Sequence, residues 1–200
     1  MTKKGLRQLP TKLPKMVVFD LDYTLWPTWI DCTGGPPYTY DDSNNTIVNT
    51  LGEVLGFFEH TATIISIIKS VPDTKIGLAS RTQTPEWARK AISLLRIPQL
   101  NNTTLRENVD YMEIYPGSKL KHFKSLSEKS GISCYDMLFF DDESRNKEVT
   151  KLGVHFVKVD TRTGITLFQF ENALHAFASN SGTVQGKMDS YFTKTNVKRK

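Results

Sequence analysis

Residues 16–27 read MVVFDLDYTLWP, an apolar run followed by two closely spaced acids. The run 16–19 has the length and character of a strand that is buried on both faces of a parallel sheet. Asp20 and Asp22 come where this strand ends, at the edge where an α/β sheet binds its ligands. Two carboxylates this close repel each other and are costly to bury without a cation. The stretch therefore predicts a metal-binding site at the end of a buried strand.

The same alternation continues along the chain. Amphipathic stretches that predict helices separate further short apolar runs, and Thr84-Pro85-Glu86 has the composition of a helix start. The predicted strands are 16–19, 76–79, 137–140 and 154–159, and the predicted helices are 53–69, 84–95, 117–130, 144–152 and 164–178. This order predicts an α/β fold of three layers, with helices on both faces of a central parallel sheet.

Length and charge indicate one domain between two basic ends. The 200 residues suit a single core, which we place at residues 16–178, and residues 26–50 are expected to form a long loop or small hairpin. Residues 1–15 carry a charge of +5 and residues 181–200 carry +4, so the net charge of +5 leaves a mildly acidic body. Such a body argues against a nucleic-acid-binding face on the domain. Without a secretory signal or an apolar span, a cytoplasmic or nuclear location is expected.

A second acidic pair, Asp141-Asp142, follows the predicted strand 137–140 in the same way. If both pairs meet at one sheet edge, four carboxylates share a pocket. Oxygen ligands of this density suit Mg²⁺. The competing interpretation is that acids after strands only cap helices or line turns, and it explains one pair more easily than two.

Two other segments add anion-binding groups at the same edge. Ser80 and Arg81 follow the predicted strand 76–79, and Lys119 opens the predicted helix 117–130. Amides at a helix start also favour an anion. In chain order, the segments supply carboxylates, a hydroxyl, a lysine and carboxylates again.

This order resembles the haloacid dehalogenase (HAD) superfamily, and the segments FDLDYTLWP, ASRT, EIYPGSK and FFDDESRN are similar to its magnesium-dependent phosphatases. The resemblance covers about residues 14–178. Ser144, where the family pattern has Asn, is the departure nearest to the acidic pair. No gap between the segments is long enough for a full cap domain. An open site would admit phosphoproteins, including tyrosine phosphates, as well as sugar phosphates.

The resemblance implies a role for each residue of the site. Asp20 would attack phosphorus and form an aspartyl-phosphate, and Asp22 would act as general acid and base. Mg²⁺ would be held by Asp20, Asp142 and the backbone carbonyl of Asp22, with Asp141 close by. The phosphoryl group and substrate would meet Leu21, Ser80, Arg81 and Lys119, while Thr24 and Asn146 would support the site from behind. Separately from the resemblance, Trp29 and Trp26 are candidates for the entrance of the site; the alternative, which is more common for a tryptophan near a strand end, is simple packing.

The two cysteines exclude one other class of phosphatase. A thiol-based enzyme needs an arginine six positions after its cysteine, and Tyr38 and Phe140 stand there after Cys32 and Cys134.

Near the C-terminus, residues 185–192 read QGKMDSYF and resemble the PIP box that docks proteins onto PCNA-type sliding clamps. One helical turn would place Met188, Tyr191 and Phe192 together as an apolar plug, with Gln185 hydrogen-bonding nearby. The alternative is that residues 179–200, predicted to be a disordered basic tail, dock on their own domain.

Three rival functions remain at this stage. A glycosyltransferase with a D-x-D pair also uses acids and a metal, but it has no use for Ser80 and Lys119. A scaffold that has lost activity would not need intact acids and lysine. A nucleotide or DNA-end phosphatase tethered to a clamp keeps the same chemistry with a different substrate.

Overall fold

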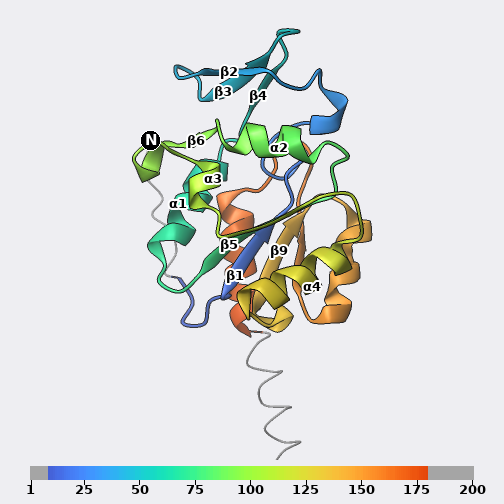
Figure 1. Ribbon diagram of the computed structural model, residues 1–200. Helices are drawn as coiled ribbons and strands as arrows, with labels where there is room; N and C mark the ends of the chain where they lie inside the picture. The colour runs from blue at the N-terminus through green and yellow to red at the C-terminus, as the bar shows by residue number, and fades with distance from the viewer. Residues whose placement is uncertain (1–8, 180–200) are drawn as a thin grey trace, which may run out of the picture.

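The computed structural model describes residues 9–179 of the chain. Within this part, parallel strands form a central sheet in the order β10-β9-β1-β5-β8 (Figure 1). Their bounds are β1 (Met16–Phe19), β5 (Lys75–Ser80), β8 (Tyr111–Ile114), β9 (Met137–Asp141) and β10 (His155–Lys158). The chain builds outward from β1 through β5 to β8, and then returns to place β9 on the other side of β1. The sheet therefore has its topological switch point beside β1, where α/β proteins bind ligands.

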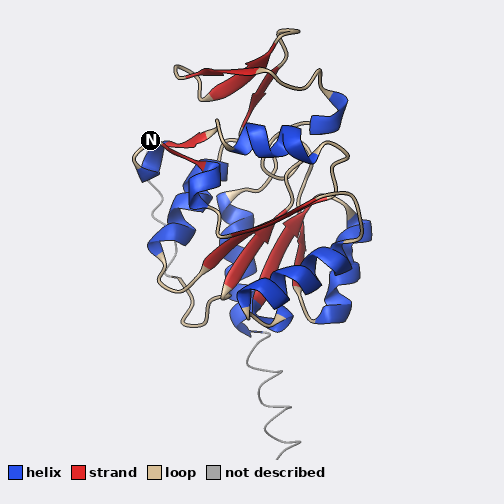
Figure 2. Cartoon of the chain, viewed as in Figure 1, coloured by secondary structure: helices blue, strands red, loops and turns tan. Residues whose placement is uncertain are grey.

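Helices cover both faces of this sheet (Figure 2). Successive side chains of β1 point to opposite faces, so Val17 packs in one apolar cluster and Val18 in another. The first cluster includes side chains of α1 (Thr61–Ser70), α2 (Pro85–Ile92) and the helical residues 167–179. The second includes side chains of α4 (Lys119–Ser130) and of the 3₁₀ helix η4 (Ser144–Leu152). The predicted three-layer α/β fold is confirmed.

The segment after β1 forms a small sheet of its own. Antiparallel strands β2 (Tyr38–Asp41), β3 (Thr46–Asn49) and β4 (Val54–Gly56) follow the 3₁₀ helix η1 (Ile30–Cys32) and lie at the top of Figure 1, beyond α2. We call residues 38–56 the flap. Asn45, at the turn between β2 and β3, accepts a hydrogen bond from the backbone N–H of Arg96 (3.0 Å) and donates one to its carbonyl (2.9 Å). The flap is therefore tied to the body, and it is too small to be a cap domain.

The flap corrects one helix prediction. The predicted helix 53–69 begins only at Thr61, because residues 54–56 pair with β3 as strand β4. A short apolar stretch fits a strand and a helix equally well, and the pairing partner decides between them.

Several short elements make up the segment between α2 and α4. It contains β6 (Arg96–Ile97), η2 (Pro98–Leu100), β7 (Thr103–Thr104) and α3 (Leu105–Asn108) before β8. The sequence YMEI of β8 lacks the continuous apolar run of β1 and β9, because Glu113 interrupts it. Another 3₁₀ turn, η3 (Cys134–Asp136), leads into β9.

The predicted tail, residues 179–200, overlaps the described part of the chain only at Ser179, which belongs to the helical residues 167–179. The clamp-motif residues Gln185, Met188, Tyr191 and Phe192 lie outside the described residues. Within residues 9–179, no helix is both long and apolar enough to cross a membrane.

Two phenylalanines of the helical residues 167–179 allow a matched test of the core. Phe170 is 1% exposed and packs against Phe140, with ring centroids 6.1 Å apart, whereas Phe168 is 70% exposed. We expect Phe170→Ala to lower the free energy of unfolding by about 3–5 kcal/mol, because it opens a cavity between helix and sheet. Phe168→Ala is expected to change it by no more than about 0.5 kcal/mol. Urea unfolding followed by circular dichroism measures both, and equal losses would contradict the packing described here.

Candidate active site

Asp20 stands at the carboxyl end of β1, in the middle of the sheet. Its backbone N–H donates to the carbonyl of Phe140 (3.0 Å), so the pairing of β1 with β9 continues through this residue. Directly after it the chain turns, because the N–H groups of Thr24 and Leu25 both donate to the carbonyl of Leu21. The Asp20 side chain is therefore held by the sheet, while the residues that follow it are held by a tight turn.

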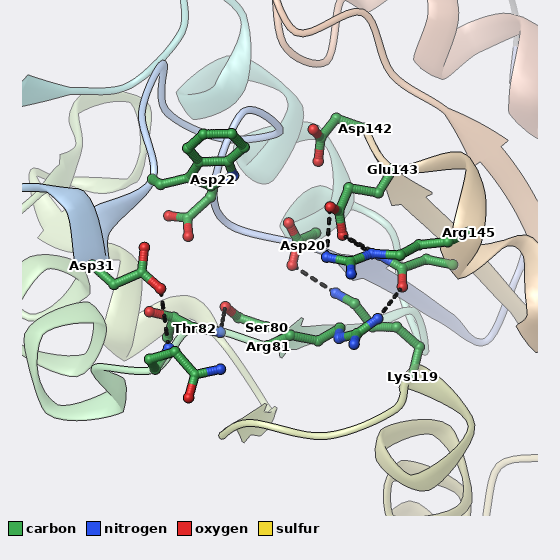
Figure 3. A pocket seen from close by; sticks show the side chains of 13 residues that line it. Asp20, Asp22, Asp31, Ser80, Arg81, Thr82, Lys119, Asp142, Glu143 and Arg145 are labelled. Atoms are coloured by element: carbon green, nitrogen blue, oxygen red, sulfur yellow. Dashed lines mark hydrogen bonds and ion pairs between the residues drawn. The ribbon is translucent and has the colours of Figure 1, made fainter.

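Lys119 binds this carboxylate from the start of α4. Its Nζ lies 2.6 Å from Asp20 Oδ1 (Figure 3). It also lies 3.0 Å from Asp141 Oδ2 and donates to the carbonyl of Ala79. The lysine is 1% exposed, so a single cation joins the ends of β1, β5 and β9 away from solvent.

The two partners of this contact, Asp20 and Lys119, both have raised pKa values, but for different reasons. Burial, helped by the neighbouring charges of Asp141 and Asp22, raises the pKa of Asp20 well above its usual range, against the pull of Lys119. Burial alone would lower the pKa of Lys119, but Asp20 and Asp141 outweigh it and raise that pKa above its ordinary value. The lysine is thus a permanent cation, and Asp20 needs more positive charge nearby to remain ionised.

Three carboxylates lie close together at the place where Asp20 needs additional positive charge. Oxygen atoms of Asp20, Asp141 and Asp142 all lie within 4.8 Å of one another. Asp141 is held by the N–H of Glu143 (2.8 Å) and by the side-chain amide of Asn146 (2.9 Å to each oxygen). Against the one charge of Lys119, three carboxylates leave two negative charges unbalanced. An all-oxygen donor set with this charge fits a hard divalent cation such as Mg²⁺.

Asp142 is the most open of the three. Its side chain is only half-buried, and burial together with the charge of Asp141 raises its pKa to about 6. A bound cation would favour its ionised form, because an opposite charge nearby stabilises the carboxylate.

Asp22 is oriented by its own loop. Its Oδ1 accepts hydrogen bonds from the indole N–H of Trp26 (2.7 Å) and from the backbone N–H of Ile30 (3.1 Å). Burial outweighs these bonds and raises its pKa to about 6. A carboxyl group with such a pKa can both give and take a proton near neutral pH, as a general acid and base must.

These residues line a pocket of about 280 Å³. Ser80 and Arg81 lie on its floor, and the Arg81 guanidinium donates to Asn146 Oδ1 (3.2 Å) (Figure 3). The pocket brings together the predicted residues Asp20, Asp22, Trp29, Ser80, Arg81, Lys119, Asp142 and Asn146.

The sequence prediction missed several pocket residues. Asp31 accepts a hydrogen bond from the backbone N–H of Gln83 (3.2 Å) and so joins the loop before the flap to the loop after β5. No signal in the sequence marks this contact, because the two residues are far apart in the chain. Thr82 directly follows Ser80-Arg81 and could have been found from that position. The full set of additional lining residues is Asp31, Thr82, Gln83, Glu143 and Arg145.

The structure also gives the positions of Leu21, Trp26 and Thr24. The Leu21 side chain is fully buried in the core, so only its main chain could reach a substrate. Trp26 is fully buried behind Asp22 instead of at the entrance, whereas Trp29 is 51% exposed and does line the pocket. The hydroxyl of Thr24 has no hydrogen-bond partner among the described residues, and its carbonyl instead accepts from the N–H of Ile165 (3.1 Å). Thr24 thus steadies the loop through its main chain.

Comparison with known proteins agrees with this arrangement. Residues 12–180 match the family described as Acid Phosphatase. A HAD-like hydrolase superfamily protein of Schizosaccharomyces pombe is 36% identical over 82% of this chain and 96% of its own. Human magnesium-dependent phosphatase 1 is 35% identical over 89% of this chain and 96% of its own. The crystal structure of a HAD-superfamily hydrolase from Ehrlichia chaffeensis superposes with a TM-score of 0.56 at 12% identity, covering 84% of this chain and 99% of the other.

The fold and the site thus define a phosphatase of the HAD superfamily. Within that class, the chain belongs to the Acid Phosphatase family.

The carboxylate cluster predicts a stabilising effect of Mg²⁺. At a concentration of 100 times its dissociation constant, the cation should add about 2.7 kcal/mol to the free energy of unfolding, which raises Tm by roughly 5–10 °C for a chain of this size. Asp142→Asn should remove most of this rise, because it removes the most open ligand. Asp42→Asn, which changes an exposed flap residue by the same charge, should keep it. Differential scanning calorimetry with Mg²⁺ and with EDTA checks this, and an equal rise in all three proteins would rule out the cluster as the metal site.

Proposed function

We propose that this protein is an Mg²⁺-dependent phosphomonoesterase that works through an aspartyl-phosphate on Asp20. The observation that carries the proposal is the buried contact of Asp20 with Lys119 at 2.6 Å, beside Asp141 and Asp142. The family membership and the resemblance to human magnesium-dependent phosphatase 1 support the same activity and cofactor.

The proposed reaction has two steps. The Asp20 carboxylate attacks phosphorus, an O–P bond forms, and the bond to the ester oxygen breaks as that oxygen takes a proton from Asp22. Asp22 then accepts a proton from water, whose oxygen attacks the phosphorus and releases inorganic phosphate together with the free Asp20 carboxylate. The hydrogen bonds from Trp26 and Ile30 engage Oδ1 of Asp22 and leave its other oxygen for this proton.

The surrounding groups bind the transferring phosphoryl group. Lys119 supplies a buried cation, Ser80 supplies a hydroxyl, and the backbone amide of Arg81 lies at the same edge. Asp20 and Asp142 would hold Mg²⁺, with the carbonyl of Asp22 as a further ligand and Asp141 behind them. When bound, the cation neutralises negative charge on the phosphoryl oxygens, which is the electrostatic task that phosphoryl transfer requires.

The substrate is proposed to be a tyrosine-phosphorylated protein or a sugar phosphate. The flap leaves the pocket open, and the exposed ring of Trp29 stands at its mouth, in edge contact with the ring of Tyr23 (5.2 Å). An open mouth with an aromatic wall suits a leaving group that extends beyond a pocket of about 280 Å³.

Asp20→Asn tests the mechanism. We expect it to reduce hydrolysis of p-nitrophenyl phosphate by roughly a thousandfold or more, because the amide cannot act as the nucleophile. EDTA should abolish the wild-type activity, and added Mg²⁺ should restore it. The matched variant Asp42→Asn should remain fully active. Hydrolysis that survives in Asp20→Asn, or that is indifferent to EDTA, would exclude this mechanism.

We also propose that residues 185–192 bind a PCNA-type sliding clamp. The support is the spacing of Gln185, Met188, Tyr191 and Phe192, together with the basic residues that follow them and suit an acidic clamp surface. Such tethering would raise the local concentration of the enzyme near DNA. It favours the alternative substrate class, nucleotides or DNA ends, over phosphoproteins and sugar phosphates. A nuclear as well as a cytoplasmic location follows from this proposal.

The clamp proposal is tested by titrating the full-length protein into the clamp in a calorimeter. Wild type should bind, and Tyr191→Ala/Phe192→Ala should lose binding because the apolar plug is removed. Both proteins should hydrolyse p-nitrophenyl phosphate equally, which shows that the domain is intact. Equal binding by the two proteins would refute the clamp motif.

A further inference from the structure

His122 is a buried titratable residue that the proposed mechanism does not use. It lies one turn after Lys119 on α4, and both side chains are almost fully buried, at 0% and 1% exposure. Its ring Nε2 lies 3.0 Å from the carbonyl oxygen of Tyr115. A carbonyl can only accept, so Nε2 carries the proton in this contact.

The second ring nitrogen of His122 shows that packing alone does not explain the residue. Nδ1 is buried and finds no hydrogen-bond partner among the described residues. An apolar side chain of similar size would fill the place without leaving an acceptor unpaired. Burial, with the nearby charges of Lys119 and Arg81, lowers the pKa of His122 to about 4, so the imidazole is neutral and adds no charge beside Lys119.

The hydrogen bond of His122 closes a short loop that carries the lysine. Residues 115–118 connect β8 to α4. Gly117 in this loop has a φ of 153°, a backbone conformation that residues other than glycine rarely adopt. The rings of His122 and Tyr115 also meet edge to face, with centroids 4.4 Å apart. The imidazole therefore joins the first turn of α4 to the beginning of the loop.

Tyr115 in turn connects this loop to β5, the strand that ends at Ser80. Its backbone N–H donates to the carbonyl of Ser80 (3.1 Å), and Ser80 lies in the pocket at the end of β5. Lys119 donates to the carbonyl of Ala79, the residue before Ser80. One connected set of bonds thus runs from His122 through Tyr115 to Ser80, and from Lys119 back to the same strand.

We infer that His122 is a positioning residue, whose Nε2–H bond to the Tyr115 carbonyl sets the spacing between Lys119 and Ser80 for a bound phosphoryl group. The expected change in the rate of hydrolysis rests on the proposed function. The expected change in the affinity for phosphate does not require that the enzyme turns over a substrate.

The experiment compares His122→Leu, His122→Gln and His122→Asn in the full-length protein with Mg²⁺. The affinity for inorganic phosphate is measured by titration calorimetry. The values of kcat and KM are measured with p-nitrophenyl phosphate, and Tm is measured by scanning calorimetry. His122→Leu removes the donor, and should weaken phosphate binding and lower kcat/KM by about 10- to 100-fold, since small misplacements of binding groups are costly. Its Tm should stay close to that of wild type, because the loss of the bond to the Tyr115 carbonyl is offset by removal of the unpaired Nδ1 acceptor. His122→Gln places an amide N–H near the position of Nε2 and should retain most of the affinity, whereas the shorter Asn cannot reach and should behave like Leu.

A matched control is His155→Leu, which removes a half-buried histidine of β10 that contacts Phe177 and should leave phosphate binding unchanged. Wild-type affinity in His122→Leu, or a Gln variant as weak as Leu, overturns the inference. If His122→Leu does not fold, the difference between Gln and Asn decides, and equal affinities overturn the inference. Phosphate binding without any hydrolysis by wild type would instead contradict the proposed function.

Discussion

A buried ammonium group, Lys119 Nζ, is the interaction on which the rest of this structure depends. An isolated charge cannot be removed from water at an acceptable cost, so its partners must be close and correctly placed. Here they are Asp20 and Asp141 at 2.6 and 3.0 Å, with the carbonyl of Ala79. Each partner comes from a different strand, and the lysine comes from the first turn of a helix. The strand order β9-β1-β5 and the helix start are therefore constrained by the same cation that the chemistry uses.

The lysine stabilises the carboxylates only in part. Three of them meet one ammonium, and burial, together with the repulsion between neighbouring acids, raises the pKa values of Asp20 and Asp142. A protein selected for stability alone would replace such a cluster with apolar residues. The unbalanced charge is instead what gives the site affinity for a divalent cation. The same cation would lower the pKa of Asp20 and so prepare it as a nucleophile, which links metal binding to reactivity.

The parts of the fold that could be predicted are those determined by short, continuous segments of the sequence. β1, β5, β9 and β10 are apolar runs, and the residues directly after β1, β5 and β9 reach the pocket because parallel strands end at a common edge. Other features depend on contacts between distant segments. Asp31 meets Gln83 only after the sheet has formed, and residues 54–56 become a strand only because β3 lies beside them. Edge strand β8 carries too little apolar sequence to be recognised alone.

Trp26 shows how the loop after β1 is organised. The sequence leaves open whether this tryptophan lines the entrance or only packs in the core. In the structure its ring is buried and its indole N–H donates to the Asp22 carboxylate at 2.7 Å. The second bond to Asp22 comes from Ile30, the first residue of η1, which leads into the flap. Asp31 follows immediately and reaches across the pocket to the loop after β5. Asp22, the proposed general acid, is therefore oriented by the same short segment that carries Trp29 and Asp31 at the mouth. In the proposed mechanism, a leaving group that contacts this segment would also act on the position of Asp22, and this would join substrate recognition to proton transfer.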